Sequence, residues 1–264
     1  MNYEGKTVWI TGASSGIGAA MCKELSSKGA NLVLSARRES ELEAVRLACE
    51  RPDSHLCLPL DVTRETAVQA AFQAILDRFG ALHSIILNAG IGQRGSVVET
   101  TLQTERDIME VNYFSVVAMT RTVLPHFLGN NEGQIVVISS VMGWVATPRR
   151  ATYAASKHAL QGYFEALRAE LYQTNVSISI VCPGYIRTQI STFSVTGDGK
   201  PFGKMDKQHR NAMTADVFAR KAIRKLERNK PIMFIGGPER FAPLLARISP
   251  GILRFFLPRL IKRD

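Results

Sequence analysis

The chain contains 264 residues, 45% of them hydrophobic, and its 33 Lys and Arg outnumber 23 Asp and Glu to give a net charge of +10. This length fits one large α/β domain or two small ones. Polar residues interrupt the N-terminus, and no apolar run approaches the roughly 18 residues of a spanning helix. We therefore expect neither a signal peptide nor a membrane span, and we predict a cytoplasmic protein.

The surplus positive charge is confined to the last quarter of the chain. Residues 1–203 hold 18 Lys and Arg and 18 Asp and Glu, whereas residues 204–264 hold 15 and 5. No recognisable nucleic-acid reading motif or aromatic platform accompanies this basic segment, so we expect no nucleic-acid partner. The cysteines lack metal-ligand spacing, which predicts reduced thiols and no metal site: Cys22, Cys49, Cys57 and Cys182.

A predicted strand over residues 6–11 leads into a glycine-rich turn and then into a helix that ends at Gly29. Glycines let the backbone approach a pyrophosphate, and a helix N-terminus supplies free N–H groups and a favourable dipole. In this strand–turn–helix context the pattern predicts dinucleotide binding, the alternative being a tight turn without ligand. The turn has the spacing Gly-x3-Gly-x-Gly, and its candidate binding residues are Gly12, Ser14, Ser15, Gly16, Ile17 and Gly18.

The second predicted strand, residues 31–36, ends where an NAD-binding chain of this type usually carries an acidic residue for the adenosine ribose. Here Arg37 and Arg38 follow instead. A guanidinium suits a 2′-phosphate, so the sequence favours NADP(H) over NAD(H). The alternative is that both arginines are solvated charges at the start of the helix predicted for residues 39–49.

The third predicted strand, residues 55–60, is followed by Asp61 and Val62 and by a helix that extends to Phe79. Asp61 is a candidate to accept a hydrogen bond from the adenine amino group. It is equally a candidate to cap the following helix. Both interpretations stay open at this point.

The fourth predicted strand, residues 84–87, ends at Asn88, Ala89 and Gly90. A long helix is then predicted over residues 104–128, with Asn112 in the middle of an apolar stretch. Asparagine is a poor helix former, and a polar group among apolar neighbours needs hydrogen-bond partners. Asn112 is therefore a candidate functional residue or a satisfied core amide.

The fifth predicted strand, residues 135–138, ends just before Ser140, and a helix carrying Tyr153 and Lys157 follows, extending to about residue 173. Positions i and i+4 lie on one face of a helix, so the last two side chains can enter the same site. A nearby ammonium lowers a tyrosine pKa from its usual ~10, and a serine hydroxyl can donate to a carbonyl oxygen. The group suits carbonyl reduction or alcohol oxidation, the alternative being a half-exposed tyrosine beside a solvated lysine.

The remaining elements complete a β/α alternation. A strand over residues 176–181 precedes Pro183 and Gly184, a polar irregular flap covers 188–212, and a helix (214–228) and a strand (232–235) follow. The pattern predicts a single-domain, doubly wound (Rossmann) parallel α/β sheet of about seven strands with helices on both faces. We place this domain at residues 1–237 and a basic amphipathic extension at 238–264.

The extension carries a helical stripe at i, i+3, i+4 and i+7, formed by Phe241, Leu244, Leu245 and Ile248. A second apolar segment with interleaved arginines follows at residues 252–261. A basic amphipathic helix of this length can lie in a membrane interface, so peripheral membrane contact through this extension is one interpretation. The alternative is packing on the chain's own body or on a partner subunit. Both interpretations favour a lipophilic substrate.

Taken together, the motifs resemble the classical short-chain dehydrogenase/reductase family over residues 6–187. They are Thr11 to Gly18, Asn88-Ala89-Gly90, Asn112, Ser140, Tyr153-x3-Lys157 and Pro183-Gly184. The resemblance implies that Tyr153 is the general acid/base, that Ser140 orients the carbonyl and that Asn112 holds a water in a proton relay. It also implies that Lys157 binds the nicotinamide ribose and lowers the tyrosine pKa, and that Pro183, Gly184 and Thr188 flank the nicotinamide.

The sequence thus predicts an NADP(H)-dependent oxidoreductase acting on a small-molecule carbonyl or secondary alcohol. An NAD-dependent alcohol dehydrogenase and a non-catalytic dinucleotide-binding regulator are the alternatives. The helices at 104–128 and 151–173 carry more apolar positions than one sheet-facing stripe needs, which predicts a homodimer or homotetramer: Met109, Val116, Thr120, Phe164, Leu167 and Leu171.

Overall fold

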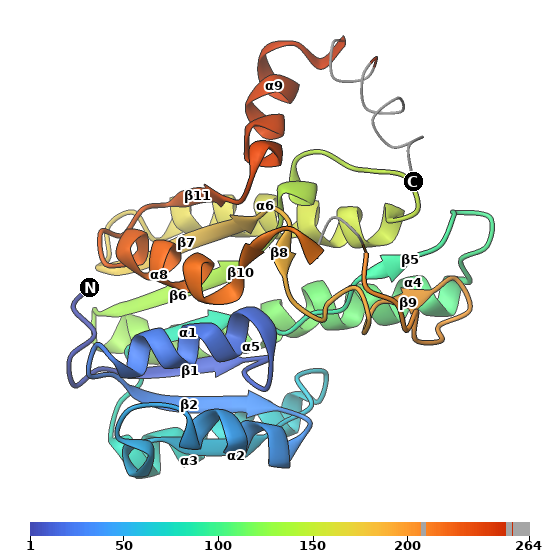
Figure 1. The fold of residues 1–264 in the computed structure, drawn as a ribbon. Coiled ribbons are helices and arrows are strands. Elements are labelled where there is room, and N and C mark those ends of the chain that lie inside the picture. Colours follow the sequence, from blue (N-terminus) through green and yellow to red (C-terminus); the bar gives the residue numbers. More distant parts are fainter. Residues whose placement is uncertain (207–209, 252–254, 256–264) are drawn as a thin grey trace.

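A seven-stranded parallel sheet forms the centre of the protein in the computed structural model, which describes residues 1–206, 210–251 and 255 (Figure 1). Its strand order is β3-β2-β1-β4-β6-β7-β11, and every neighbouring pair is parallel. The strands are β1 (Thr7–Thr11), β2 (Asn31–Ala36), β3 (Leu56–Pro59), β4 (Ser84–Leu87), β6 (Gly133–Ile138), β7 (Val176–Pro183) and β11 (Ile232–Ile235). The predicted doubly wound fold is confirmed.

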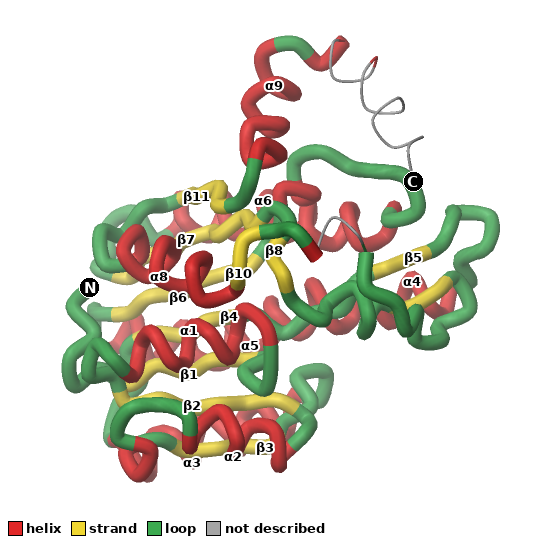
Figure 2. The backbone as a smooth tube through the Cα atoms, viewed as in Figure 1, coloured by secondary structure: helices red, strands yellow, loops and turns green. Residues whose placement is uncertain are grey.

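Helices cover both faces of this sheet (Figure 2). Side chains from α1 (Gly16–Ser26), α2 (Glu39–Leu47) and α8 (Ala215–Leu226) form the core on one face. Side chains from α3 (Glu65–Phe79), α5 (Ser115–Gly129) and α6 (Ala151–Glu170) form the core on the other. Other helices of the described residues are α4 (Leu102–Met109), α9 (Ala242–Ile248), a π-helix at Glu110–Phe114 and short 3-10 turns at Pro52–Ser54, Val141–Gly143 and Pro238–Phe241.

The strands alternate between the two cores. In β1, Val8 and Ile10 belong to the core under α1 and α8, whereas Trp9 belongs to the opposite core. All three are fully buried, because both faces of a parallel sheet are covered by helices. The Trp9 indole N–H donates to Ser35 Oγ at 2.9 Å, so its single polar atom is satisfied inside the core.

The segment predicted as one long helix over 104–128 is instead three consecutive helical pieces. A π-helix at Glu110–Phe114 separates α4 from α5. Asn112 lies within it and is completely buried. π-Segments in helices are often found at functional sites, because the wider turn changes the direction of side chains.

The apolar side chains that were expected to form a subunit interface on these helices pack mainly inside the protomer. Of the six predicted positions, Met109 is half-buried, whereas Val116, Thr120, Phe164, Leu167 and Leu171 are all buried by the chain itself. They face the sheet and each other, so they do not mark a subunit interface. The large exposed apolar side chains of this region are others, namely Leu102, Phe114, Leu128 and Tyr172.

The flap predicted as irregular over residues 188–212 contains a short strand, and two further short strands, one just before and one just after the flap, pair with each other. β9 (Val195–Thr196) pairs with β5 (Gln93–Arg94), and β10 (Met213–Thr214) pairs with β8 (Ile186–Arg187). These pairs hold the described part of the flap beside the carboxyl edge of the main sheet.

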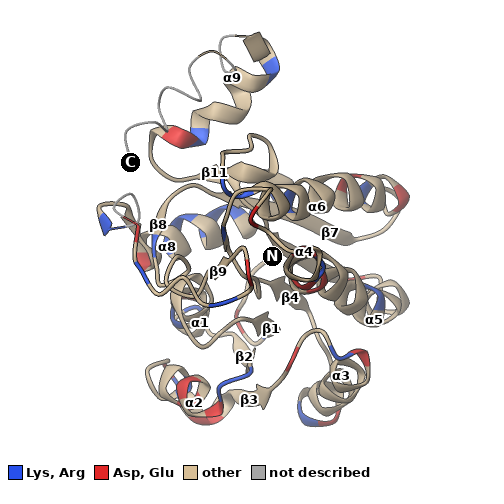
Figure 3. Cartoon of the chain, turned by 90° about the vertical axis from the view of Figure 1, so that its right-hand side faces the viewer, with Lys and Arg blue, Asp and Glu red and all other residues tan. Residues whose placement is uncertain are grey.

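The basic last quarter of the chain contributes an exposed stripe on α8. Its exposed positions include Arg220, Lys221, Arg224 and Lys225, which colour the helix blue in Figure 3, while its buried positions pack against α1. Helix α9 rises away from the sheet layers (Figure 1), and its four stripe residues are exposed. The second apolar segment predicted at 252–261 lies, apart from Phe255, outside the described residues. Among the described helices, none has the length and apolarity to span a bilayer.

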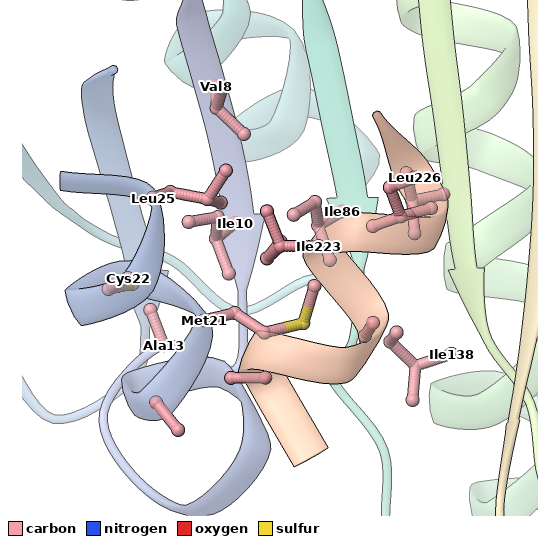
Figure 4. Packing of buried hydrophobic residues seen from close by; sticks show 14 of the residues in the cluster. Val8, Ile10, Ala13, Met21, Cys22, Leu25, Ile86, Ile138, Ile223 and Leu226 are labelled. Carbon is pink, nitrogen blue, oxygen red and sulfur yellow. The ribbon is translucent and has the colours of Figure 1, made fainter. Parts of the chain in front are cut away.

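We expect Ile223→Ala to destabilise the fold by about 2–5 kcal/mol, because Ile223, on α8, is fully buried in the core that includes Ile10 and Ile86 (Figure 4). Urea unfolding followed by far-UV circular dichroism measures this loss. Leu47→Ala is the matched control, since Leu47 is 61% exposed, and it should change the free energy of unfolding by less than about 0.5 kcal/mol. Equal effects of the two substitutions would contradict the described packing.

Candidate active site

A cavity of about 1430 Å³ opens at the carboxyl edge of the sheet. Loops after β1, β2, β3, β4, β6 and β7 line it, as expected where the ends of parallel strands meet. Of the site residues predicted from sequence, Gly18 and Asn112 lie behind the wall. The others line the cavity: Gly12, Ser14, Ser15, Gly16, Ile17, Arg37, Arg38, Asp61, Val62, Asn88, Ala89, Gly90, Ser140, Tyr153, Lys157, Pro183, Gly184 and Thr188.

The glycine turn is packed too closely for side chains. Gly12 and Gly16 have positive φ angles of 63° and 57°. A methyl group on Gly18 would lie 2.2 Å from the Gly12 carbonyl oxygen, which is shorter than any van der Waals contact. Ser15 caps α1 without a side-chain hydrogen bond, so the N-terminal N–H groups of this helix have no side-chain acceptor from the cap. The turn is therefore shaped to receive an anionic group from the cavity.

Thr11 and Asn88 join the ends of β1 and β4 beneath this turn. Asn88 Nδ2 donates to the carbonyl oxygens of Thr11 and Gly12 at 2.9 and 3.2 Å. The backbone N–H groups of Asn88 and Ala89 donate to Thr11 Oγ1 at 3.0 and 3.1 Å. These bonds fix the floor of the cavity where the two loops meet.

Two arginines and one aspartate lie at the cavity end beside β2 and β3. Arg38 forms an ion pair with Glu41 at 2.6 Å, whereas Arg37 is exposed and has no ion pair among the described residues. Asp61 Oδ1 accepts hydrogen bonds from the N–H and hydroxyl of Thr63 at 3.1 and 2.8 Å. The N-cap of α3 is Arg64, so the alternative in which Asp61 caps this helix is wrong, and Asp61 instead closes a turn before it.

Ser140 and Lys157 are held by backbone groups at the end of β6. Ser140 Oγ accepts a hydrogen bond from the Met142 N–H at 3.0 Å, which leaves the hydroxyl hydrogen available to another acceptor. Lys157 is 5% exposed, and its ammonium donates to the Ile138 carbonyl at 3.0 Å. Burial lowers the pKa of Lys157 to about 8.

Tyr153 lies one helical turn before Lys157, and the Lys157 Nζ is 5.9 Å from the centroid of its ring. Burial raises the pKa of Tyr153 above its usual 10, while a hydrogen bond with Ser140 and the charges of Arg150 and Arg94 oppose the increase. This differs from the expected lowering by Lys157. The ammonium lies over the ring and is itself desolvated, so it contributes less to the tyrosine pKa than the two arginines do.

Asn112 joins the π-segment to the cavity wall. Its Oδ1 accepts from the Ile91 N–H at 2.8 Å, and its Nδ2 donates to the Ile91 carbonyl at 2.9 Å and to Ser156 Oγ at 3.2 Å. A methyl group on Gly90 would lie 3.1 Å from Asn112 Oδ1 and 3.7 Å from Lys157 Nζ. Asn112 is therefore a satisfied core amide that also borders the space next to the lysine.

A glutamate from the predicted extension closes the cavity edge after β7. Glu239 Oε1 accepts from the N–H groups of Tyr185 and Gly237 at 2.8 and 2.9 Å. A side chain on Gly184 would collide with this carboxylate, at 2.0 Å. The first residues after Gly237, Pro238 and Glu239, therefore line the cavity.

Sequence reasoning missed many of the residues that line the cavity, among them the charged residues Arg94, Arg150 and Glu239. Arg150 immediately precedes the helix that carries Tyr153, so its position was a usable signal. Arg94 and Glu239 follow no spacing rule, and only the tertiary fold brings them to the cavity. No cluster of three potential metal ligands is found among the residues that the structure describes.

Comparison with known proteins agrees with this fold. The model of the short chain dehydrogenase family matches residues 6–198. A dehydrogenase/reductase SDR family protein 7-like from Anopheles gambiae is 37% identical over 95% of this chain and 81% of its own length. Dehydrogenase/reductase SDR family member 7B from Xenopus tropicalis is 36% identical over 97% and 86%. The chain belongs to the short-chain dehydrogenase/reductase family and is an oxidoreductase of that family.

Solved structures show the same architecture. A short chain dehydrogenase/reductase from Burkholderia phymatum in complex with NAD superposes with a TM-score of 0.82 at 25% identity, covering 97% of this chain and 96% of that one. A short chain dehydrogenase from Burkholderia cenocepacia in complex with NADP gives a TM-score of 0.80 at 25% identity, with 97% and 99% coverage.

Proposed function

We propose that this chain is an NADP(H)-dependent oxidoreductase that interconverts a lipophilic carbonyl compound and its secondary alcohol. The observation that carries the proposal is the cavity itself. One end has a phosphate-sized glycine turn, and the other end has Ser140, Tyr153 and Lys157. A dinucleotide that reaches from one end to the other would have its reactive ring beside these three side chains.

The residues present fit such a cofactor. The glycine turn and the N-terminus of α1 would hold the pyrophosphate. Because Gly12, Gly16 and Gly18 carry no side chains, the pyrophosphate can come close to the backbone of the turn. Lys157 would bind the nicotinamide ribose, and Pro183, Gly184 and Thr188 would flank the nicotinamide. Asn88, Ala89 and Gly90 would line the adenine–ribose side, with Asp61 and Val62 next to the adenine. The cofactor supplies the hydride that is exchanged with the substrate carbon.

The protein's own part is to move a proton and to stabilise charge on the substrate oxygen. Ser140 Oγ, which already accepts from Met142, donates its hydrogen to that oxygen. Tyr153 transfers the proton. Because burial raises its pKa, the hydroxyl is protonated at neutral pH, and this state suits a general acid in carbonyl reduction. The Asn112 side chain supports the wall behind Lys157, and the helix backbone at Asn112 is the proposed holder of a relay water.

The preference for NADP(H) rests on Arg37. Relatives of similar overall structure contain NAD in one case and NADP in another, so the family leaves both open. Arg38 is engaged with Glu41 and packs over the Phe193 ring at 5.1 Å, whereas Arg37 lines the cavity without an ion pair among the described residues. An available guanidinium at this place favours a 2′-phosphate.

The lipophilic character of the substrate rests on the far wall of the cavity. Phe241, Leu244, Leu245 and Ile248, from the end of the last 3-10 turn and from α9, line the cavity although they are largely exposed. An exposed apolar face of this kind marks a contact with ligand, lipid or another subunit. We include two such contacts in the proposal, a homodimer or homotetramer and peripheral membrane contact through the extension.

On catalysis, Tyr153→Phe should reduce turnover at least ~100-fold, the usual contribution of a general acid–base group, because the ring stays in place while the proton donor is lost. A ketone panel followed at the NADPH absorbance band measures this. Tyr172→Phe is the matched control, since Tyr172 is 77% exposed, and it should keep full activity. Near-normal turnover by the Tyr153 variant would remove this residue from the mechanism.

On the cofactor, NADPH should be preferred over NADH by at least ~10-fold, or about 1.4 kcal/mol. Arg37→Ala should reduce this preference, because the cation facing the 2′-phosphate is lost. Fluorescence titration with both dinucleotides measures it, and Arg78→Ala, an exposed arginine outside the cavity lining, is the control. A preference for NADH, or an unchanged ratio in the Arg37 variant, would contradict the proposal.

On assembly, light scattering should give a mass at least twice the chain mass of 29.1 kDa. On membrane contact, the protein should bind anionic liposomes at low salt and float with them in a density gradient. If the double variant Leu244→Asp/Ile248→Asp has the mass of a monomer in light scattering, the α9 face contacts a partner subunit. If the variant keeps its oligomer mass but no longer floats with the liposomes, this face contacts lipid. Leu47→Asp is the exposed control on α2. A monomer mass together with no flotation of the wild type would contradict both parts of the proposal.

A further inference from the structure

Two buried arginines in the substrate half of the cavity share a single carboxylate. Arg94 Nη2 and Arg150 Nη2 both donate to Asp206 Oδ2, the latter at 2.9 Å. Their side chains are only 10% and 14% exposed. A guanidinium stays protonated in proteins, so one carboxylate leaves one positive charge of the cluster uncompensated. Burying such a charge is costly unless a counter-ion reaches it.

The arginines face the cavity, whereas the carboxylate does not. Arg94 and Arg150 are part of the lining, and Asp206, although described, is not. The other acid on this wall, Asp107, is exposed, accepts a hydrogen bond from Gln103 at 2.8 Å, and forms no ion pair with either arginine among the described residues. The free charge of the cluster is therefore directed at the space where a substrate would lie.

The same side chains have unused donors. Arg94 Nη1 donates to the Gln93 carbonyl at 2.7 Å, but its Nε is buried and has no hydrogen-bond partner in the part of the chain that the structure describes. Arg150 Nη1 contacts the sulfur of Met142 at 3.7 Å, and a thioether is a weak acceptor. The Arg94 Nε is closed off from the cavity, but the Arg150 Nη1 can exchange this weak contact for a charge-assisted hydrogen bond to an oxyanion in the cavity.

This cluster is fixed next to the proton-transfer residue. Gln93 Oε1 accepts from the backbone N–H groups of Thr152 and Tyr153 at 3.0 and 3.1 Å, which joins the Gln93–Arg94 strand to the start of α6. Arg150 immediately precedes the same helix. The charges of both arginines already act on the hydroxyl, since they oppose the rise of the Tyr153 pKa.

We infer that the substrate is an acidic lipophilic carbonyl compound whose carboxylate or phosphate is bound by Arg94 and Arg150. The inference rests on the proposed function as a carbonyl reductase. Hydride from the reduced nicotinamide adds to the carbonyl carbon and the Tyr153 proton to its oxygen, which yields a secondary alcohol, while the acidic group is unchanged. Arg94 and Arg150 thus select the substrate by its charge.

Paired substrates test this selection. With NADPH, the wild type should show a kcat/KM for 4-oxodecanoate at least ~10-fold higher than for its methyl ester, since the two differ in charge at one end. Arg150→Met and Arg94→Met should bring this ratio close to one. Each variant also loses a cation near Tyr153, which should change the turnover of both substrates equally. The ratio of the two kcat/KM values cancels this effect and reports only the selection by charge. Arg149→Met is the control, since Arg149 is 64% exposed and outside the lining, and it should leave the ratio unchanged.

A binding measurement separates this inference from the proposed function. Calorimetry with octanoate, octyl phosphate and octanamide needs no turnover. At least one of the anions should bind ~10-fold more tightly than the amide, and the tighter anion shows whether a carboxylate or a phosphate is preferred. If the ester is reduced but neither anion is favoured, or the preference survives in both arginine variants, the inference is overturned while the oxidoreductase proposal stands. If the anions bind through the arginines but neither oxodecanoate compound is reduced, the proposed function fails instead.

Discussion

The parallel arrangement of the central strands is the constraint on which the rest of this protein depends. Because every neighbouring pair in the sheet is parallel, the loops after β1, β2, β3, β4, β6 and β7 emerge at one edge. Residues separated by more than a hundred positions are thereby brought to one cavity without any long-range covalent link. The Thr11–Asn88 bonds and the Lys157–Ile138 bond then fix individual loops relative to the strand ends.

Much of this was predictable from sequence, for a physical reason. Strands buried on both faces are continuous apolar runs, and short polar motifs follow each run, so periodicity alone located β1, β2, β4, β6, β7 and β11. The glycines at the first turn were predictable because close backbone packing excludes side chains there. What the pattern missed depends on tertiary neighbours. Arg94 and Glu239 reach the cavity through a two-residue strand and a short turn, neither of which has a periodic signal.

The electrostatic expectation for Tyr153 was incomplete for a similar reason. An adjacent lysine lowers a tyrosine pKa only when it is charged and close to the oxygen. In the fold, burial acts on both groups, lowering the pKa of Lys157 and raising that of Tyr153. The cations that oppose the tyrosine shift come from outside the Tyr-x3-Lys motif. Desolvation, which depends on the whole structure, therefore decides a property that local spacing was expected to determine.

The π-segment has a consequence for the phase of its helix. Five buried positions follow one another at intervals of four residues: Thr104, Ile108, Asn112, Val116 and Thr120. In a regular α-helix each step of four turns about 40° too far, so such a row would wind out of the core within a few turns. The wider π-turn at Glu110–Phe114 takes up part of that rotation. All five positions therefore stay on the buried side of the helix. The amide of Asn112 lies in the middle of this row, and the helical chain continues through it.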